Sequence, residues 1–327
     1  MSALKIGKKY NFGYFVKEIW WKNFVLNGEH KQSTIDYYRS MSRRILVAFE
    51  DTKITNITSL EIEAFLSSLI RENLSPATRH HHRRILTNIF NYAHRHDIIE
   101  KNPMNSVAAI KPGSKRVEFL APDQAFALIA ALKEAPKQWQ CMITIYILAG
   151  LRRGEAVALQ WKDIDFDAGL LSVSKAVTYS KESGTSVGTP KTEAGIRVLP
   201  LSQAALDQLK DWKQYQEQQT KHPLPAEAYI FPGERGLLEP MHPHTPTRWL
   251  RRFLKKRDLP NVSPHDLRHT CGALMLASGE ATVKDTQEFL GHEDASTTLR
   301  FYAGTTPETL RKAATGLETI IYSDKKP

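Results

Sequence analysis

The sequence predicts a mainly α-helical protein with a small antiparallel sheet, divided into two domains. Its 327 residues are about twice the length expected for one compact domain. Apolar residues recur at helical spacing along most of the chain, and strands are predicted only within residues 170–199. The run Lys111-Pro112-Gly113-Ser114-Lys115-Arg116 is short, polar and basic, and it is the best linker candidate in the chain.

We therefore expect a helical domain over residues 1–110, a basic linker over 111–118 and a larger domain over 119–327. Residues 1–118 contain 19 Lys and Arg against 11 Asp and Glu, whereas the rest of the chain contains 26 against 24. A basic small domain next to a nearly neutral one indicates a polyanionic partner, and nucleic acid is the first candidate. Charge that serves only solubility is the alternative.

The composition also predicts where the protein works. Two cysteines, Cys141 and Cys271, provide no disulfide framework and suit a reducing compartment. The N-terminus lacks the apolar segment of a signal peptide. The longest apolar run, residues 141–151, is about half the length of a membrane-spanning helix. We expect a soluble, cytoplasmic protein with no membrane partner.

Helices are expected to fill the first domain from about residue 12. The apolar stripe of residues 33–49 consists of Tyr38, Met41, Ile45 and Phe49. A cap at residues 57–61 predicts a helix through Ile70. Ser75 as N-cap, with Pro76 in the first turn, predicts a helix to about His94. The buried side of that helix is predicted to hold Leu86, Ile89, Phe90 and Ala93.

The second domain is expected to place helices around a short β region. Helices are predicted at 122–134, 138–150, from near Arg152, and at 202–217, 245–257, 265–278 and 282–290, with a last one after Thr306. Strands are predicted at 170–177 and 196–199. Glu193-Ala194-Gly195 is expected to form the turn of a hairpin between a strand that carries Lys191 and the next strand.

Polar residues of the second domain fit phosphodiester cleavage. This reaction needs an in-line nucleophile, cations on the phosphate oxygens and a proton for the leaving oxygen. Carboxylates do not cluster in the sequence. His80, His81 and His82 are consecutive on a helix and point in different directions, which favours a DNA-facing or solvated helix face over a zinc site. We therefore expect no metal and no other cofactor. Arginines would then supply the cations, and Arg152 and Arg268 are the candidates because a guanidinium can hold two phosphate oxygens.

Two further residues are placed to support these arginines. Glu155 lies three residues after Arg152 and would orient it, although an ordinary surface ion pair has the same spacing. His265 lies three residues before Arg268 at a helix start, so the two side chains should project together. Arg153 is the alternative to Arg152 and would point elsewhere.

The remaining candidates supply the proton and the nucleophile. Lys191 would protonate the leaving oxygen, and His292 would donate to the phosphate. Tyr302 would be the nucleophile. Each of the three has an ordinary interpretation as a solvent-exposed or core residue. All candidate residues of the second domain occur together and in a fixed order along the chain, and this order favours the functional interpretation.

At these residues the chain resembles the tyrosine recombinase (phage integrase) family. Members carry a first block G-x-R-x-x-E, a lysine in a β-hairpin, H-x-x-R, then L-G-H and a tyrosine about ten residues later. In this chain the corresponding residues are Arg152, Glu155, Lys191, His265, Arg268, His292 and Tyr302. The segments 73–78 and 99–103 also resemble the helical core-binding domain of the family.

The resemblance implies a two-domain DNA clamp, with the helical core-binding domain and the catalytic domain on opposite sides of a duplex. Tyr302 would attack the scissile phosphate to form a 3′-phosphotyrosine, while Lys191 protonates the departing 5′-hydroxyl. The two arginines and two histidines would stabilise the charge on the phosphate. Neither ATP nor a metal would be required.

The resemblance also implies partners and a location. The partners are double-stranded DNA with a specific crossover site, accessory directionality proteins and other copies of the chain. The chain would be a monomer in solution and a tetramer in the synaptic complex. A bacterial or phage-encoded enzyme of this kind would act in the cytoplasm, at the nucleoid.

Basic side chains on three predicted helices are the candidates for contacts with DNA phosphates, which dominate affinity. They are Arg39, Arg43, Arg79, Arg83, Arg248, Arg251 and Arg252.

Three other functions are alternatives to a recombinase. A type IB topoisomerase-like strand transferase would share the chemistry, a DNA-binding regulator would lack it, and a cysteine hydrolase would use Cys271 with His269.

Overall fold

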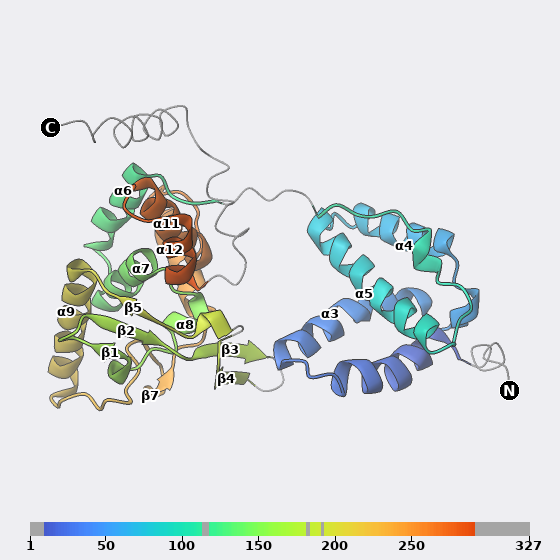
Figure 1. The fold of residues 1–327 in the computed structure, drawn as a ribbon, viewed down its shortest axis with the longest axis horizontal. Coiled ribbons are helices and arrows are strands. Elements are labelled where there is room, and N and C mark those ends of the chain that lie inside the picture. The colour runs from blue at the N-terminus through green and yellow to red at the C-terminus, as the bar shows by residue number, and fades with distance from the viewer. Residues whose placement is uncertain (1–9, 113–117, 181–183, 191–192, 292–327) are drawn as a thin grey trace, which may run out of the picture. The chain divides into compact units, whose positions relative to one another are not determined.

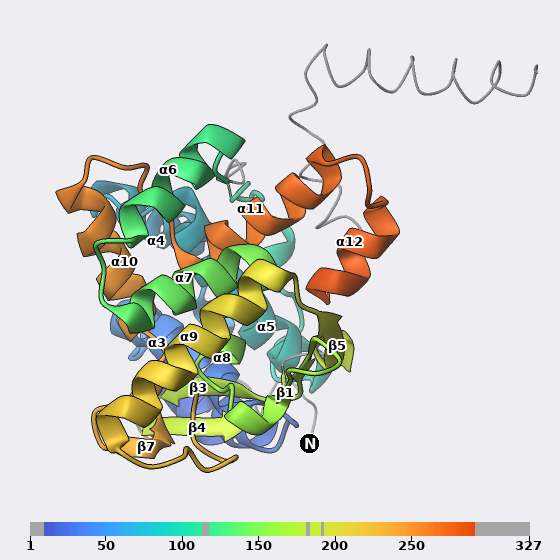
Figure 2. The same cartoon turned by 90° about the vertical axis from the view of Figure 1, so that its left-hand side faces the viewer.

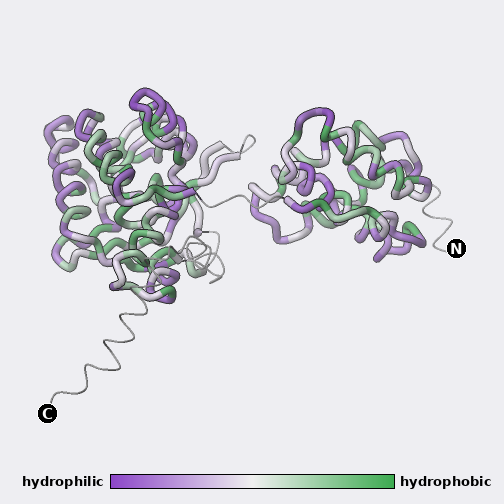
Figure 3. The backbone as a smooth tube through the Cα atoms, turned by 90° about the horizontal axis from the view of Figure 1, so that it is seen from above, coloured by the Kyte–Doolittle hydropathy of each residue, from purple (hydrophilic) through white to green (hydrophobic). Residues whose placement is uncertain are grey.

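A computed structural model describes residues 10–112, 118–180, 184–190 and 193–291 (Figure 1). The chain forms two compact units, Met1–Lys115 and Arg116–Pro327, each with its own hydrophobic core. In each unit the apolar stretches gather in the interior (Figure 3). The predicted fold class, mainly helical with small antiparallel sheets, is confirmed.

The first unit is entirely helical in its described part. Its elements are α2 (Phe12–Tyr14), the π-helix η1 (Phe15–Leu26), α3 (Gln32–Phe49), the 3-10 turn η2 (Ile54–Asn56), α4 (Ser59–Arg71), α5 (Pro76–Arg95) and the 3-10 turn η3 (Pro103–Asn105). The predicted caps explain where two of these helices begin. Thr58 and Glu61 form a capping box at α4, and Ser75 accepts from the Thr78 N–H at 3.2 Å at α5.

The core of this unit follows the predicted stripes. Of the stripe on α3, Tyr38, Ile45 and Phe49 are buried, and Met41 packs against them while partly exposed. The four residues predicted to lie on the buried side of α5 are all fully buried. The sequence-based assignment of these two helices is therefore confirmed.

The second unit contains these described helices: α6 (Pro122–Leu132), α7 (Lys137–Ala149), α8 (Arg153–Ala156), η4 (Trp161–Asp163), η5 (Glu193–Gly195), α9 (Gln203–Thr220), α10 (Thr245–Lys256), α11 (Pro264–Ala277) and α12 (Val283–Leu290). Helix α7 is the central one, and it packs against α9 and α11 (Figure 2). In the described part of the chain, no helix combines the length and the apolar character needed to cross a membrane.

The β region is more divided than predicted. One antiparallel sheet has the order β1-β2-β5, from β1 (Ile164–Asp165), β2 (Leu170–Val173) and β5 (Arg197–Pro200). A separate hairpin joins β3 (Ala176–Ser180) to β4 (Gly184–Gly188), and a small third sheet joins β6 (Pro232–Gly233) to β7 (Gly236–Pro240).

The single strand predicted over 170–177 is wrong. Buried Leu171, Val173 and Val177 continue one alternation across the break, which makes two strands look like one. The break occurs at Lys175, whose Nζ donates to Gln160 Oε1 at 2.9 Å. The strands then pair with different partners.

The hairpin predicted around Glu193–Gly195 is also wrong. This turn is present as η5, but β5 after it pairs with β2, whereas β4 before it pairs with β3. The turn therefore connects two sheets. Lys191 itself lies outside the described residues.

Candidate active site

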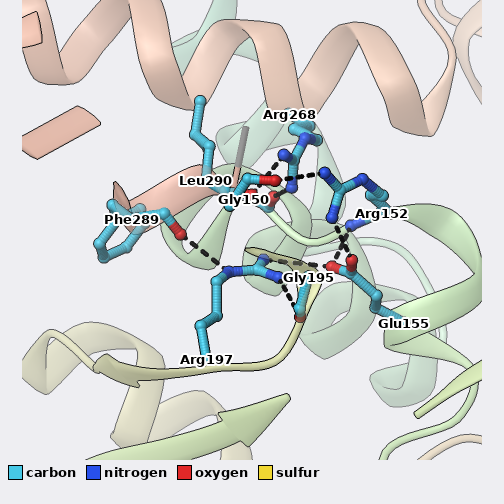
Figure 4. A network of polar contacts seen from close by, with 9 residues as sticks. Gly150, Arg152, Glu155, Gly195, Arg197, Arg268, Phe289 and Leu290 are labelled. Atoms are coloured by element: carbon cyan, nitrogen blue, oxygen red, sulfur yellow. Dashed lines mark hydrogen bonds and ion pairs between the residues drawn. The ribbon is translucent and has the colours of Figure 1, made fainter. Parts of the chain in front are cut away.

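Segments that are far apart in the sequence meet at the C-terminal end of α7. They are the α7–α8 connection, the start of β5, the first half of α11 and the end of α12 (Figure 4). Three of them contribute an arginine, namely Arg152, Arg197 and Arg268. The cluster thus contains both predicted cations and one arginine that the sequence analysis did not single out.

Glu155 is the acidic centre of this cluster. Its side chain is 1% exposed, and its carboxylate binds Arg152 at 2.6 Å and Arg197 at 3.1 Å. It also accepts from the backbone N–H of Arg152 at 2.9 Å. Burial alone would raise the pKa of the Glu155 carboxyl, but the charges and hydrogen bonds of Arg197 and Arg152 outweigh burial and lower this pKa. The ionised carboxylate therefore fixes two guanidinium groups.

Arg152 is the N-cap of α8, and so precedes the helix on which Glu155 lies. Its Nη1 donates to Glu155, and its Nη2 donates to the carbonyl oxygen of Gly291 at 2.5 Å. The side chain remains 32% exposed. Because a guanidinium has more N–H groups than these contacts use, Arg152 keeps an oriented, accessible edge for an anion.

Arg197, the first residue of β5, is the functional candidate that the sequence analysis missed. Its side chain is 7% exposed. Besides Glu155, it donates to the Phe289 carbonyl at 2.9 Å and to the Gly195 carbonyl at 3.1 Å. Arg197 therefore ties the turn before β5 and the end of α12 to the Glu155–Arg152 pair. Arg197 lies two residues before Leu199, which is buried, and residues two apart on a strand share a face. This spacing was the sequence signal that could have placed Arg197 on the inner face.

Arg268 lies fully buried in α11. Its Nη1 donates to the Gly150 carbonyl at 2.6 Å, and its Nη2 donates to the Leu290 carbonyl. Burial, followed by the charge of Arg152, lowers the pKa of Arg268 to about 9, so the group is still a cation at neutral pH. Its Nε has no hydrogen-bond partner among the described residues.

Two glycines allow these segments to approach one another. Gly150 ends α7 with φ of 57°, and a Cβ there would collide with Leu290 and lie 3.1 Å from Cys271 Sγ. Gly291 ends α12 with φ of 66°, and a Cβ there would collide with the carbonyl oxygen of Ala194. Both positions require the left-handed conformation and the absence of a side chain.

His265 lies in the first turn of α11, between Ser263 and Asp266, which form a capping box. Its ring centroid is 4.4 Å from that of buried His269, with the planes at 69°. Burial, followed by the charge of Arg268, lowers the pKa of His265. Its imidazole is therefore neutral at pH 7, and it can donate one hydrogen bond.

Three predicted site residues, Lys191, His292 and Tyr302, lie outside the described residues. Two of them adjoin the cluster in the sequence. Lys191 precedes the η5 turn by two residues, and His292 directly follows Gly291, whose carbonyl binds Arg152. The last predicted helix, after Thr306, is likewise outside the described part.

The alternatives to the predicted site find no support among the described residues. Arg153, the alternative to Arg152, points to a different partner, His244 Nδ1, at 3.0 Å. Cys271 is buried, and burial raises the pKa of its thiol to about 12, so the thiol is not an available nucleophile. Among the described residues, no group of three or more His, Cys, Asp or Glu could hold a metal ion.

The candidate DNA-contact residues of the first unit differ in their availability. Arg43 is exposed on α3, whereas Arg39 lies with its guanidinium carbon 5.3 Å from the Trp21 ring centroid. Arg79 is partly buried on α5. Arg83 donates to the Ala108 carbonyl at 2.9 Å and to the Val107 carbonyl at 3.0 Å, so it holds the chain after η3.

The histidine-rich start of α5 is not one DNA-facing surface, because its three histidines are engaged by different parts of the first unit. His82 is buried against Phe65, and burial lowers its pKa. His80 bonds to the Ile110 carbonyl at 2.8 Å, and His81 to the Tyr37 hydroxyl at 3.0 Å. The expectation of a DNA-facing or solvated face is therefore wrong for His82.

The candidates on α10 are exposed. Pro246, Leu250, Phe253 and Leu254 bury one side of the helix. Arg248, Arg251 and Arg252 are exposed. A helix with one apolar and one cationic side is typical of a surface that binds a polyanion.

Comparison with known proteins identifies the family. The sequence profile of the phage integrase family matches residues 118–308, which is more than half of the chain. The chain belongs to the phage integrase family. It is a site-specific DNA recombinase of the tyrosine type, an enzyme that cleaves and rejoins DNA strands. A non-catalytic regulator is thereby excluded.

The similarity to relatives of the recombinase covers most of the chain. It is 28% identical to the ICEBs1 integrase of Bacillus subtilis over 302 residues, which are 88% of this chain and 78% of that protein. It is 26% identical to a XerC-like tyrosine recombinase of Caldanaerobacter subterraneus over 324 residues, which are 92% of this chain and 81% of that protein.

Solved structures share the fold of the recombinase. The Tn1549 transposon integrase, in complex with a circular intermediate DNA, matches with a TM-score of 0.76 and 21% identity. That match covers 97% of this chain and 99% of the other. A lambda integrase tetramer bound to a Holliday junction matches with a TM-score of 0.66 and 21% identity, covering 91% and 79%.

Proposed function

We propose that this recombinase cuts DNA at a specific crossover site with Tyr302 as nucleophile and with the Arg152–Glu155–Arg197–Arg268 cluster as its anion site. The observation that carries the proposal is the placement of this cluster. Its hydrogen bonds end on Gly195, Phe289, Leu290 and Gly291, which flank Lys191 and His292 in the sequence. The cluster therefore joins the segments that would carry the proton donor and the remaining phosphate ligand.

The proposed cleavage follows from the properties of these groups. The Tyr302 phenol gives up its proton to solvent and its oxygen attacks phosphorus. The bond to the 5′-oxygen breaks, and Lys191 gives that oxygen a proton. Arg152 binds a non-bridging oxygen through its exposed edge, while His265, which is neutral at pH 7, and His292 donate further hydrogen bonds. Buried Arg268 contributes its positive charge and its Nε, which has no hydrogen-bond partner among the described residues. Because Glu155 and the main-chain carbonyls already fix the guanidiniums, little reorganisation is needed when the phosphate binds.

The proposed partners are the DNA of a mobile element and other copies of the chain. The integrase names of its relatives support a role in integration or excision. Directionality proteins are further proposed partners. We propose four protomers on two duplexes, as in the lambda integrase tetramer, and a monomer in solution. Such an enzyme would work in the cytoplasm, at the nucleoid.

Covalent capture tests the nucleophile. The full chain is mixed with nicked duplexes of random sequence, and strands that stay attached to protein in detergent are sequenced. We expect one recurrent crossover sequence, captured equally well with and without a chelator of divalent metals. Capture should be lost in Tyr302→Phe, because the phenol oxygen forms the bond.

A matched variant and a second assay sharpen this test. Tyr215→Phe, in a residue 40% exposed on α9, should still form the adduct. Persistence of the adduct in Tyr302→Phe would show that another residue is the nucleophile. With the captured site in two labelled duplexes, exchange of strands between them would distinguish a recombinase from an enzyme that only relaxes one duplex.

A further inference from the structure

A second cationic cluster begins one residue after Arg152. It consists of Arg153 in α8, Tyr179 in β3, His242 and His244 before α10, and Arg248 in the first turn of α10. We call these five residues the histidine–arginine cluster. The Tyr179 ring centroid lies 4.4 Å from that of His242 and 6.2 Å from that of His244, and the two imidazoles are 5.4 Å apart.

The hydrogen bonds of this cluster fix the protonation state of both histidines. Arg153 Nη1 lies 3.0 Å from His244 Nδ1, and because a guanidinium can only donate, Nδ1 must accept. The backbone N–H of His244 donates to His242 Nδ1 at 3.2 Å. An imidazole that accepts at Nδ1 carries its proton on Nε2 and is neutral. Protonation of either Nδ1 would therefore break a hydrogen bond.

The cluster has an excess of positive charge. Burial lowers the pKa of both histidines, and the charges of Arg153 and Arg248 lower it further. For His244 the charge of His242 also lowers the pKa. Helix α10 also starts at His244 without a side-chain cap, so its positive end is not neutralised by a side-chain acceptor. The cluster therefore has the composition of an anion site.

We propose that the histidine–arginine cluster binds a non-scissile phosphate of the DNA backbone and that a histidine takes up a proton when the phosphate binds. Each DNA strand carries a phosphate about every 3.4 Å along the axis, so a duplex that reaches Arg152 brings further phosphates near Arg153. Arg153 then turns from His244 to the phosphate, and the freed Nδ1 accepts a proton from solvent. The inference rests on the proposed function, in which the DNA backbone reaches Arg152, but it does not depend on which residue is the nucleophile.

Tighter binding at lower pH follows from this exchange. In the free protein burial, followed by the charges of the arginines, holds the pKa of the histidines below the ordinary value of 6.5, whereas a bound phosphate raises it. Between the two pKa values, binding takes up a proton, so the Kd falls as the pH falls through this range. Uptake of one proton gives a change in Kd of up to about tenfold per pH unit.

Single methylphosphonate linkages, which are uncharged, test the phosphate contact. The full chain carrying Tyr302→Phe is titrated with the captured crossover duplex, in which one phosphate at a time is replaced. We expect one non-scissile position where the replacement weakens binding about tenfold. Arg153→Gln should bind the unmodified duplex more weakly, and at that position only its Kd should no longer respond to the methylphosphonate replacement. Arg251→Gln on α10 should weaken binding, but the methylphosphonate replacement at that position should still raise its Kd.

The pH dependence tests the proton uptake. At constant ionic strength, the Kd should fall from pH 8 to about pH 5.5, and His244→Gln together with His242→Gln should remove most of that fall. Thermal melting checks that each variant is folded. A methylphosphonate profile of Arg153→Gln identical to that of the parent overturns the phosphate site, and an unchanged pH slope in the histidine variant overturns the proton uptake. Failure to bind any duplex would instead contradict the proposed function.

Discussion

Arg197 and Glu155 form an ion pair of 3.1 Å whose side chains are 7% and 1% exposed. A pair so deeply buried contributes stability only while both partners and their hydrogen bonds are in place. Here the remaining donors of Arg197 bind the Gly195 and Phe289 carbonyls, and the other carboxylate oxygen binds Arg152. The pair therefore connects the fold of the second unit to the orientation of Arg152.

Replacement of Arg197 by methionine tests this connection. Because Glu155 would be left buried with half of its partners, we expect a loss of about 3 to 5 kcal/mol in the free energy of unfolding. We also expect strand cleavage to slow on the order of 100-fold, since small displacements of positioned groups have effects of that size. Urea titration and the rate of adduct formation measure the two effects.

Two comparisons separate positioning from general loss of stability. Arg197→Lys keeps the charge and should recover part of the cleavage rate at a DNA Kd close to that of the parent. A substrate with sulfur as the leaving atom needs no proton from Lys191. If Arg197 positions the η5 turn, this substrate should recover part of the rate in Arg197→Met. Equal defects with both substrates and a matching loss of DNA affinity would contradict the positioning role.

The lowered pKa of Glu155 predicts how stability depends on pH. A carboxyl whose pKa is lower in the folded protein than its ordinary value of 4.5 stabilises the fold fully above that value. This stabilisation is lost as the pH falls through the folded pKa. Glu155→Gln should therefore be less stable than the parent at pH 7, and the difference should shrink below about pH 4.5.

Thermal melting at a series of pH values measures that difference. Glu288→Gln is the matched control, because Glu288 is 70% exposed and lies 3.9 Å from Lys284 in a surface pair. It should change stability by less than about 0.5 kcal/mol. A constant difference between parent and Glu155→Gln from pH 7 to pH 3 would show that Glu155 is not the acid-sensitive group.

Gly291→Ala tests the contact between the end of α12 and the η5 turn. The backbone there has φ of 66°, and an added Cβ would collide with the Ala194 carbonyl oxygen and lie 3.1 Å from Arg197 Cδ. We expect a loss of about 1 kcal/mol from the backbone and about 1 to 3 kcal/mol more from overpacking. Cleavage should slow as well, because the Gly291 carbonyl holds Arg152.

Gly279→Ala separates these two effects. Gly279 has φ of 79°, but nothing lies within 4 Å of its added Cβ. Its replacement should therefore show only the backbone effect, of about 1 kcal/mol in thermal melting, and leave the cleavage rate unchanged. Equal losses in the two variants would mean that the contact with Ala194 contributes nothing.

The sequence predicts local parts of the site better than its long-range parts. The spacing of Arg152 and Glu155 predicted their contact, although Arg152 turns out to be the N-cap of α8. On β5, however, the alternation is the reverse of the usual pattern. Ile196 and Val198 are 54% and 59% exposed, while Arg197 points inward. A polar residue between two apolar ones would normally be placed outside.

The reason is that the partners of Arg197 are remote in the sequence. Glu155 is 42 residues away and Phe289 is 92 residues away. Contacts between residues so far apart in the sequence do not follow the short periods of helices and strands, so the sequence does not reveal them. Arg83 illustrates the same limit, because its spacing on α5 fits a DNA-facing arginine, whereas its guanidinium is engaged by two carbonyls beyond η3.

The salt dependence of DNA binding should distinguish Arg252 from Arg83. Arg252 is exposed on α10, so a phosphate contact would release about one counterion, and Arg252→Gln should lower the slope of log Kd against log salt concentration by about one. Arg83→Gln should leave this slope unchanged and reduce the free energy of unfolding by about 2 kcal/mol, because two carbonyls lose a charged donor. Anisotropy titrations with the crossover duplex at several salt concentrations measure the slope. An altered slope in Arg83→Gln together with an unaltered one in Arg252→Gln would reverse the assignment of these two arginines.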